Sequence, residues 1–204
     1  MTSRLLFATR LYRAELEGQR GFDLVDLAGA CAMMAAEDTA GRAWSKTNGY
    51  PGYTSYSSPG PLWTRASAFA DLKTTLDRHA KAFAGELGLD LASGRLRLDS
   101  LWVNVLKAGG GHTGHIHPHS VISGTVYVAV PPGASALKLE DPRLAMMMAA
   151  PMRKPDAPAD QQPFVYETPA PGTLLMWESW LRHEVPPNGA KTERVSVSFN
   201  YGWR

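Results

Sequence analysis

The sequence predicts a mainly β chain of the α+β class, a double-stranded β-helix or jelly roll with N-terminal helices packed on one face. Two observations predict it. Apolar residues recur at helical intervals within the first 94 residues, and after Gly94 they alternate in short runs that are separated by turns. Helices first and short strands afterwards favour a jelly roll covered by helices.

The composition of the 204 residues fits a single domain, with a helical part at 1–94 that includes an early strand and a jelly-roll core at 95–204. Lys and Arg number 21 against 19 Asp and Glu and are scattered, so a nucleic-acid partner is not expected. The single cysteine, Cys31, cannot form an intramolecular disulfide. Neither a secretory signal nor a membrane span is recognisable, so we expect a cytoplasmic location; a homodimer is left open.

The N-terminal part is expected to contain one strand and two helices. Short-range apolar residues predict the strand at 5–16. Ala, Leu, Met and Glu predict a helix at 23–42 with Asp23 as its N-cap, and a loop rich in Gly and Pro follows at 45–61. Apolar residues recur every three and four positions at 65–87, which predicts the clearer helix.

The second part is expected to form strands at 96–106, 122–130, 137–139, 164–167, 173–177 and 195–201. The segment 141–163 between them contains five prolines and three consecutive methionines. Such a segment is typical of a long ordered loop over a barrel mouth, or of a flexible insertion.

A cluster of histidines is the strongest chemical signal. Four of the six histidines lie within eight residues, at 112, 115, 117 and 119. Alternate residues of a strand share a face, so His115 and His117 can present two imidazoles to one metal ion. His183 follows a later strand and is a candidate third ligand, which would leave coordination positions open. The alternative is a set of surface histidines; within the cluster, His112 and His119 are the weaker candidates.

The final strand alternates strictly and places Arg194 and Ser196 on one polar face. That face can lie in water, or it can line the barrel near the metal. In the second case the planar guanidinium of Arg194 suits the far carboxylate of a dicarboxylic acid, and Ser196 can add a hydroxyl. Asn104 and Tyr127 are polar positions of the same kind on two other strands.

Several of these residues fall into a pattern that resembles a family of 2-oxoglutarate- and Fe(II)-dependent oxygenases of bacteria and phages. The resemblance covers about residues 101–203. It rests on Trp102-x-Asn104-Val105, His115-x-His117-Pro118, Ser123-Gly124, Tyr127-Val128, Asp141-Pro142-Arg143, Ser179-Trp180-Leu181-x-His183 and Arg194-x-Ser196-x-Ser198-Phe199-Asn200.

The resemblance implies Fe(II) at His115, His117 and His183, with 2-oxoglutarate chelating the metal and dioxygen as the second cosubstrate. It further implies that Arg194 binds the distal carboxylate, with Ser196 and Tyr127 assisting. The expected reaction is hydroxylation of an unidentified substrate with release of succinate and CO2.

One position departs from the wider superfamily, which has a carboxylate where this chain has His117. Either His117 replaces that carboxylate, or another acid such as Asp141 or Glu184 reaches the metal. Two other functions also remain open: a cupin-like metalloenzyme that does not use 2-oxoglutarate, and a non-enzymatic jelly roll that binds a metal or another ligand.

Overall fold

The computed structural model describes residues 2–204 and is built mainly from antiparallel strands. One sheet has the strand order β1-β8-β5-β10-β3-β2 and the other the order β4-β9-β6-β7. The elements are β1 (Leu11–Glu15), α1 (Leu24–Glu37), α2 (Thr39–Thr47), β2 (Gly52–Thr54), η1 (Leu62–Thr64), α3 (Ser67–Glu86), β3 (Leu96–Leu106), β4 (His112–His115), β5 (Ile122–Ala129), β6 (Leu137–Glu140), η2 (Leu144–Met146), η3 (Ala159–Gln161), β7 (Phe164–Glu167), β8 (Thr173–Glu178), β9 (His183–Val185) and β10 (Arg194–Trp203).

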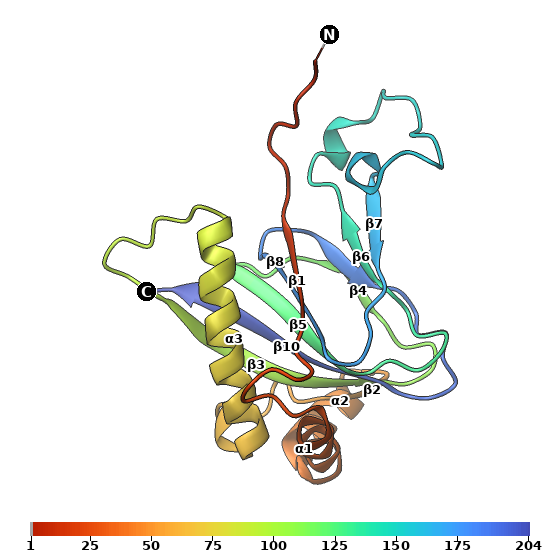
Figure 1. The fold of residues 1–204 in the computed structure, drawn as a ribbon. Coiled ribbons are helices and arrows are strands. Elements are labelled where there is room, and N and C mark those ends of the chain that lie inside the picture. Colours follow the sequence, from red (N-terminus) through yellow and green to blue (C-terminus); the bar gives the residue numbers. More distant parts are fainter. Residues whose placement is uncertain (1) are drawn as a thin grey trace.

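The predicted arrangement of a jelly roll with helices on one face is confirmed. Apolar side chains of α1 and α3, such as Leu27, Phe69 and Phe83, pack with the outward side chains of the six-stranded sheet in one large core (Figure 1). A smaller core between the two sheets contains Leu139 and Leu175. Among residues 2–204 the two sheets do not join into a closed barrel.

Strand β10 confirms the strict alternation that its sequence predicts. It lies between β3 and β5, where Ser196 stands opposite Asn104 on one side and Tyr127 on the other. Its apolar residues Val197 and Phe199 are fully buried in the helix-covered core. The polar side chains at 194, 196, 198 and 200 therefore point to the inner face, toward the second sheet, rather than into water.

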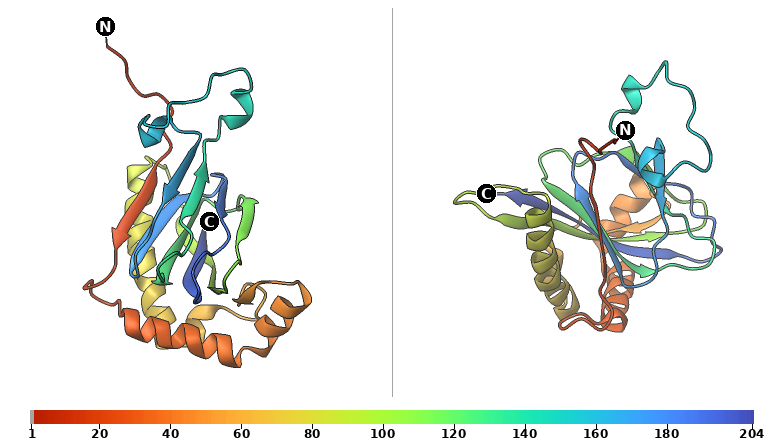
Figure 2. Two further views of the ribbon diagram at one scale, coloured as in Figure 1. Left: turned by 90° about the vertical axis from the view of Figure 1, so that its right-hand side faces the viewer. Right: turned by 45° about the horizontal axis from the view of Figure 1, so that its top comes forward.

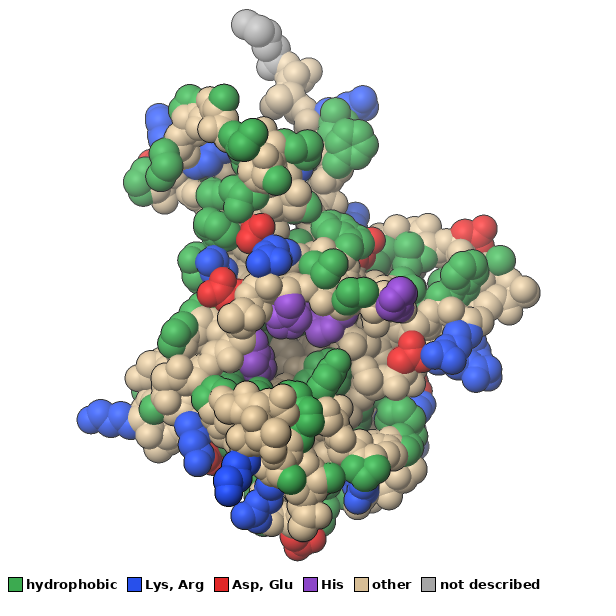
Figure 3. All heavy atoms as spheres, turned by 180° about the vertical axis from the view of Figure 1, so that it is seen from behind, with side chains coloured by type: hydrophobic (Ala, Val, Ile, Leu, Met, Phe, Trp, Pro, Cys, Tyr) green, Lys and Arg blue, Asp and Glu red, His purple; other side chains and the backbone are tan. Residues whose placement is uncertain are grey.

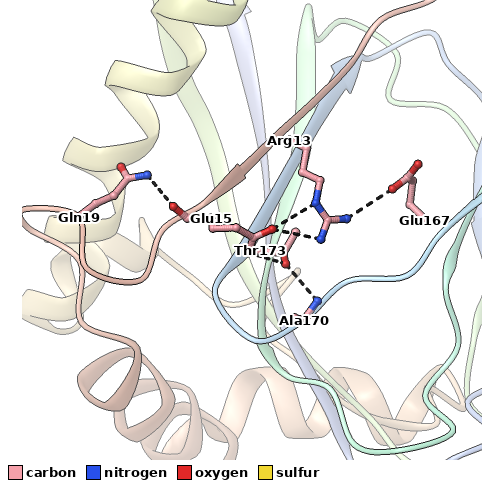
Figure 4. Close-up of polar contacts among 6 residues, drawn as sticks. All are labelled: Arg13, Glu15, Gln19, Glu167, Ala170 and Thr173. Atoms are coloured by element: carbon pink, nitrogen blue, oxygen red, sulfur yellow. Dashed lines mark hydrogen bonds and ion pairs between the residues drawn. The ribbon is translucent and has the colours of Figure 1, made fainter.

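The predicted N-terminal strand at 5–16 is shorter than expected. Strand β1 begins at Leu11, and Phe7 ahead of it is 95% exposed because no other element covers it. Polar contacts attach β1 at its end: Thr173 donates to Glu15 over 2.9 Å, and Arg13 lies 3.5 Å from Glu167 of the other sheet (Figure 4). The edge strand β1 thus connects the two sheets.

The helix expected at 23–42 is interrupted, and that prediction is wrong in its second half. Asp23 caps α1 as predicted, because its carboxylate accepts hydrogen bonds from the amides of Val25 and Asp26. The first helix ends at Asp38, whose carboxylate accepts a bond from the amide of Gly41 and so caps α2. The segment expected to be a loop at 45–61 therefore contains the end of α2 and the short strand β2, which pairs with β3.

Most predicted elements agree with the structure, and the bounds of strands β2, β4 and β9 were not predicted. The helix at 65–87 is α3, and the strands at 96–106, 122–130, 137–139, 164–167 and 173–177 are β3, β5, β6, β7 and β8. The expectation that His115 and His117 share one strand is wrong, because β4 ends at His115. Strands β2, β4 and β9 have only three or four residues, too few to show a period.

The segment 141–163 leaves the two sheets as a long excursion that contains only the short turns η2 and η3 (Figure 2). Its methionines point outward: Met148 is 92% and Met152 is 96% exposed. Across residues 2–204, no helix combines the length and the apolar character needed to cross a bilayer.

Replacing Asp38 by Ala should lower the free energy of unfolding by about 2 kcal/mol, because the carboxylate caps α2 and accepts hydrogen bonds from Tyr53 and Ser58. Urea unfolding at pH 7 measures the loss. Asp156→Ala, on the exposed excursion, is the matched control and should change nothing; an equal effect of both would contradict the capping role.

The same carboxylate predicts a pH dependence. Burial tends to raise the pKa of Asp38, but hydrogen bonds from Ser58, Gly41 and Tyr53 outweigh burial, and the pKa is lowered overall. A lowered folded-state pKa contributes stability above the usual value of about 3.9 that is lost as the pH falls through the folded-state value. The stability difference between the native protein and Asp38→Ala should thus narrow below about pH 4.

Candidate metal centre

Three imidazoles converge where strands β4 and β9 of the smaller sheet pair. His115 on β4 stands directly opposite His183 on β9. His117 lies two residues beyond β4, and its position is fixed because its amide donates to the carbonyl of Ser179 over 3.0 Å. One ring nitrogen from each of the three histidines lies within 4.8 Å of those of the other two. The structure thus brings together the three residues that the sequence singled out.

Backbone carbonyls orient two of these rings. Nδ1 of His115 lies 2.7 Å from the carbonyl of Thr113, and Nδ1 of His183 lies 2.9 Å from that of Leu181. A carbonyl oxygen can only accept, so each Nδ1 carries the proton and each Nε2 presents its lone pair to the space between the rings. Nε2 of His117 and Nε2 of His183 lie 3.2 Å apart.

Burial keeps two of the imidazoles uncharged. It is the main cause that lowers the pKa of His117 to about 4 and that of His183 to about 3, and the neighbouring His115 acts in the same direction. Both rings are therefore neutral at pH 7. A neutral imidazole is the form that binds a metal ion, so these two rings need no deprotonation before they can do so.

The two acids considered as alternative ligands are engaged elsewhere. Asp141 forms an ion pair of 2.8 Å with Arg143, and Glu184 one of 3.1 Å with Lys138. Within residues 2–204, the cluster of candidate ligands contains His115, His117 and His183 and no carboxylate. The geometry thus favours the first of the two alternatives, a centre of three imidazoles.

The three imidazoles line a cavity of about 520 Å³ between the sheets. In Figure 3 histidine side chains gather around this hollow, which opens to the surface. Among its described lining residues, the excursion 141–163 contributes none, which disfavours the first of the two alternatives for this segment, a loop over the mouth. The cavity instead extends inward to the polar face of β10.

Arg194 lies in this cavity and is 2% exposed. Its guanidinium forms no ion pair with an acid of the described chain, and its buried Nε has no hydrogen-bond partner. The guanidinium lies over the ring of Tyr127, with its central carbon 4.9 Å from the ring centroid. Burial lowers the pKa of Arg194, yet a guanidinium remains charged at pH 7. A buried charge without a counter-charge is costly, so this position calls for an anion.

The two residues expected to assist Arg194 lie beside it. Tyr127 is fully buried, its hydroxyl has no partner, and burial, as the largest cause, raises its pKa to about 12, which keeps it a neutral donor. Ser196 is 3% exposed and lines the same cavity, opposite Tyr127 in the strand register. The cavity therefore holds several donors near one another.

Asn104 also lines the cavity, but its amide is occupied within the protein. Its Oδ1 accepts bonds from Thr54 (3.0 Å) and Tyr50 (3.2 Å), and its Nδ2 donates to Ser198 over 3.1 Å. The predicted cofactor contact of Asn104 thus stays a prediction. The bonds that the structure shows attach strand β2 and Tyr50 to the cavity wall.

Further residues line the cavity. His112, the first residue of β4, bonds through Nε2 to the hydroxyl of Tyr50 over 2.8 Å and lies outside the metal cluster. Trp177 is 3% exposed, its ring packs on His183 at 4.7 Å, and its Nε1 has no partner. Trp44 and Tyr56 line the mouth, and both escaped the sequence analysis. Trp44 lies on α2, and Tyr56 lies in the segment 45–61 that its Gly and Pro content marked as a loop.

Comparison with known proteins gives the family. A family model described as "Putative 2OG-Fe(II) oxygenase" matches residues 100–200, which include all three histidines and Arg194. Comparison with curated proteins finds no match.

Solved structures show the same fold. A prolyl-4-hydroxylase of Pseudomonas putida is 19% identical, with a TM-score of 0.60 over 95% of this chain and 93% of that one. The non-heme alpha ketoglutarate dependent epimerase SnoN is 17% identical, with a TM-score of 0.66 over 96% and 77%. SnoN in complex with Fe3+, alpha ketoglutarate (2-oxoglutarate) and nogalamycin RO is 16% identical, with a TM-score of 0.64 over 96% and 79%. Taken together with the family model, these findings show that the chain belongs to the 2OG-Fe(II) oxygenase family, whose members use Fe(II) and 2-oxoglutarate.

Proposed function

We propose that this protein is an oxygenase that hydroxylates a C–H bond of its substrate. The balanced reaction takes substrate C–H, dioxygen and 2-oxoglutarate to C–OH, succinate and CO2. One observation carries the proposal: three converging imidazoles and a buried guanidinium without a counter-charge face the same cavity. A metal ion and a carboxylate are the ligands that these two groups call for.

The proposed ligands of Fe(II) are His115, His117 and His183. Three protein ligands leave coordination positions for exogenous ligands, which a catalytic centre requires and a structural one does not. When bound, the iron supplies the redox chemistry that couples decarboxylation of 2-oxoglutarate to oxidation of the substrate. The carbonyls of Thr113 and Leu181 hold two of the rings so that Nε2 stays available.

The proposed site for the distal carboxylate of 2-oxoglutarate is Arg194 with Tyr127 and Ser196. A guanidinium offers parallel donors to a carboxylate, and inside a buried site such charge-assisted bonds are strong. The partnerless hydroxyl of Tyr127 supplies another donor at the same place. Trp177 offers an indole N–H near His183, at the metal end of the cavity. When 2-oxoglutarate binds to these four residues, it takes the place of water molecules in the cavity.

Production of succinate tests the reaction. Purified protein with Fe(II), dioxygen and 2-oxoglutarate should form succinate slowly even without the substrate, and anaerobic addition of Fe(II) and 2-oxoglutarate should give a visible charge-transfer band. A metal-dependent activity without consumption of 2-oxoglutarate would indicate the cupin-like alternative. Tight Zn²⁺ binding without the band would indicate a binding module.

Arg194→Met should weaken 2-oxoglutarate binding by about 100-fold or more, because truncating one partner of a buried charge pair costs several kcal/mol. The charge-transfer band measures the affinity. Without 2-oxoglutarate the variant should unfold at an equal or higher urea concentration, since it loses an unpaired buried charge. Arg182→Met is the control, because Arg182 is exposed and pairs with Glu140. Unchanged affinity in Arg194→Met would refute the anchor.

His117→Ala should lower the affinity for Fe(II) by at least about 100-fold, because the variant loses one of the three protein ligands of the metal. Anaerobic titration with the metal measures it. His119→Asn is a matched control from the same histidine run, at a backbone φ of 70° that Asn tolerates. Glu184→Gln tests the alternative ligand. If Glu184→Gln lost the metal and His117→Ala kept it, the assignment of His117 would be wrong.

A further inference from the structure

Three aromatic side chains form a continuous wall from the surface to the metal centre. We call Trp44, Tyr56 and Trp102 the aromatic wall. The ring centroids of Trp44 and Tyr56 are 6.3 Å apart, and those of Tyr56 and Trp102 are 5.5 Å apart. Trp102 in turn lies 6.1 Å from the ring of His117. A molecule lying on this wall therefore reaches the candidate metal.

The outer end of the aromatic wall is uncovered. Tyr56 is 62% exposed although it is a large aromatic residue at the mouth of a cavity. Exposed aromatic faces of this kind are binding surfaces for flat groups, which stack on them or contact them edge-on. Trp44 on α2 and Tyr56 after β2 both lie outside the residues 100–200 that match the family model. The family match therefore does not cover this part of the cavity.

The charge of the cavity restricts what can bind there. Its described lining residues include no Asp, Glu or Lys, and Arg194 is their one permanently charged side chain. The two negative charges of 2-oxoglutarate offset the two positive charges of Fe(II). The loaded cavity therefore keeps one net positive charge, that of Arg194. A positively charged substrate would find no counter-charge in the cavity, and burying it would be costly.

We propose that the substrate carries an aromatic or saturated ring without a positive charge, and that this ring lies on the aromatic wall. The inference rests on the proposed function, which places the iron beside His117. The wall holds one face of the ring and directs its edge toward the metal centre. Trp44 and Tyr56 are then specificity-determining residues for a neutral or anionic ring.

Saturation-transfer NMR tests this on protein loaded with Zn²⁺, a diamagnetic substitute for iron, and saturated with 2-oxoglutarate. The probes are phenylacetamide, phenylacetate, phenethylamine and hexanamide. They supply a neutral ring, an anionic ring, a cationic ring and a neutral chain without a ring. The variants are Tyr56→Ala, Tyr56→Phe and Trp44→Ala. Tyr166→Ala is the matched control, because Tyr166 is 58% exposed but lies on β7 away from the cavity lining.

The neutral and anionic rings should bind at least about threefold more tightly than phenethylamine and hexanamide. Tyr56→Ala and Trp44→Ala should each weaken ring binding by about threefold to tenfold, while Tyr56→Phe and Tyr166→Ala should not. Equal binding of phenethylamine or hexanamide, or ring binding that survives Tyr56→Ala, would overturn the inference.

The same spectra separate this inference from the proposed function. The methylene protons of 2-oxoglutarate report its own binding in every sample. If 2-oxoglutarate binds but no ring is preferred, the aromatic wall does not recognise the substrate and the proposed function stands. If 2-oxoglutarate itself shows no transfer, or retains it in Arg194→Met, the proposed function fails first.

Discussion

The inner face of β10 carries a row of polar side chains that need partners inside the protein, and this requirement shapes the cavity. Ser198 bonds to Thr125 over 3.3 Å, and Asn200 accepts a bond of 2.7 Å from Ser123. Farther along the same strand, Arg194 finds no acid in the described chain. Some polar side chains of this row thus have hydrogen-bond partners within the protein, while the guanidinium of Arg194 has no acidic partner there. We expect a ligand to supply the missing partner.

The two sheets divide the chemistry between them. The large sheet supplies the donors proposed to bind an anion, Arg194 and Tyr127, on long strands whose register is fixed by a buried face. The small sheet supplies two of the three proposed metal ligands, through pairing of His115 with His183. These four residues belong to paired strands, and such support is what a site of defined geometry needs.

Sequence reasoning succeeded where regular pattern and tertiary structure agree. The alternation at 194–201 in β10 and the helical repeat in the twenty residues of α3 are long enough to identify both the element and its buried face. Strands such as β9 have only three residues and form because a partner strand is present, which no local pattern reveals. The same holds for the break at Asp38, where capping outweighs the helix-favouring residues on either side. The imidazoles and Arg194 were found because their chemistry is unusual; the rings at 44 and 56 were missed because an isolated aromatic residue shows no distinctive pattern.

Asp38 has a consequence for how this protein can change over evolutionary time. It attaches the segment that bears Trp44 and Tyr56 through bonds to Gly41, Tyr53 and Ser58, all of which lie within that segment. Part of the stability of the segment therefore comes from its own contacts, and Tyr50 ties it to β4 through His112. A substitution in this stretch, well before the histidines in the chain, would therefore reshape the cavity mouth without replacing any of the three imidazoles.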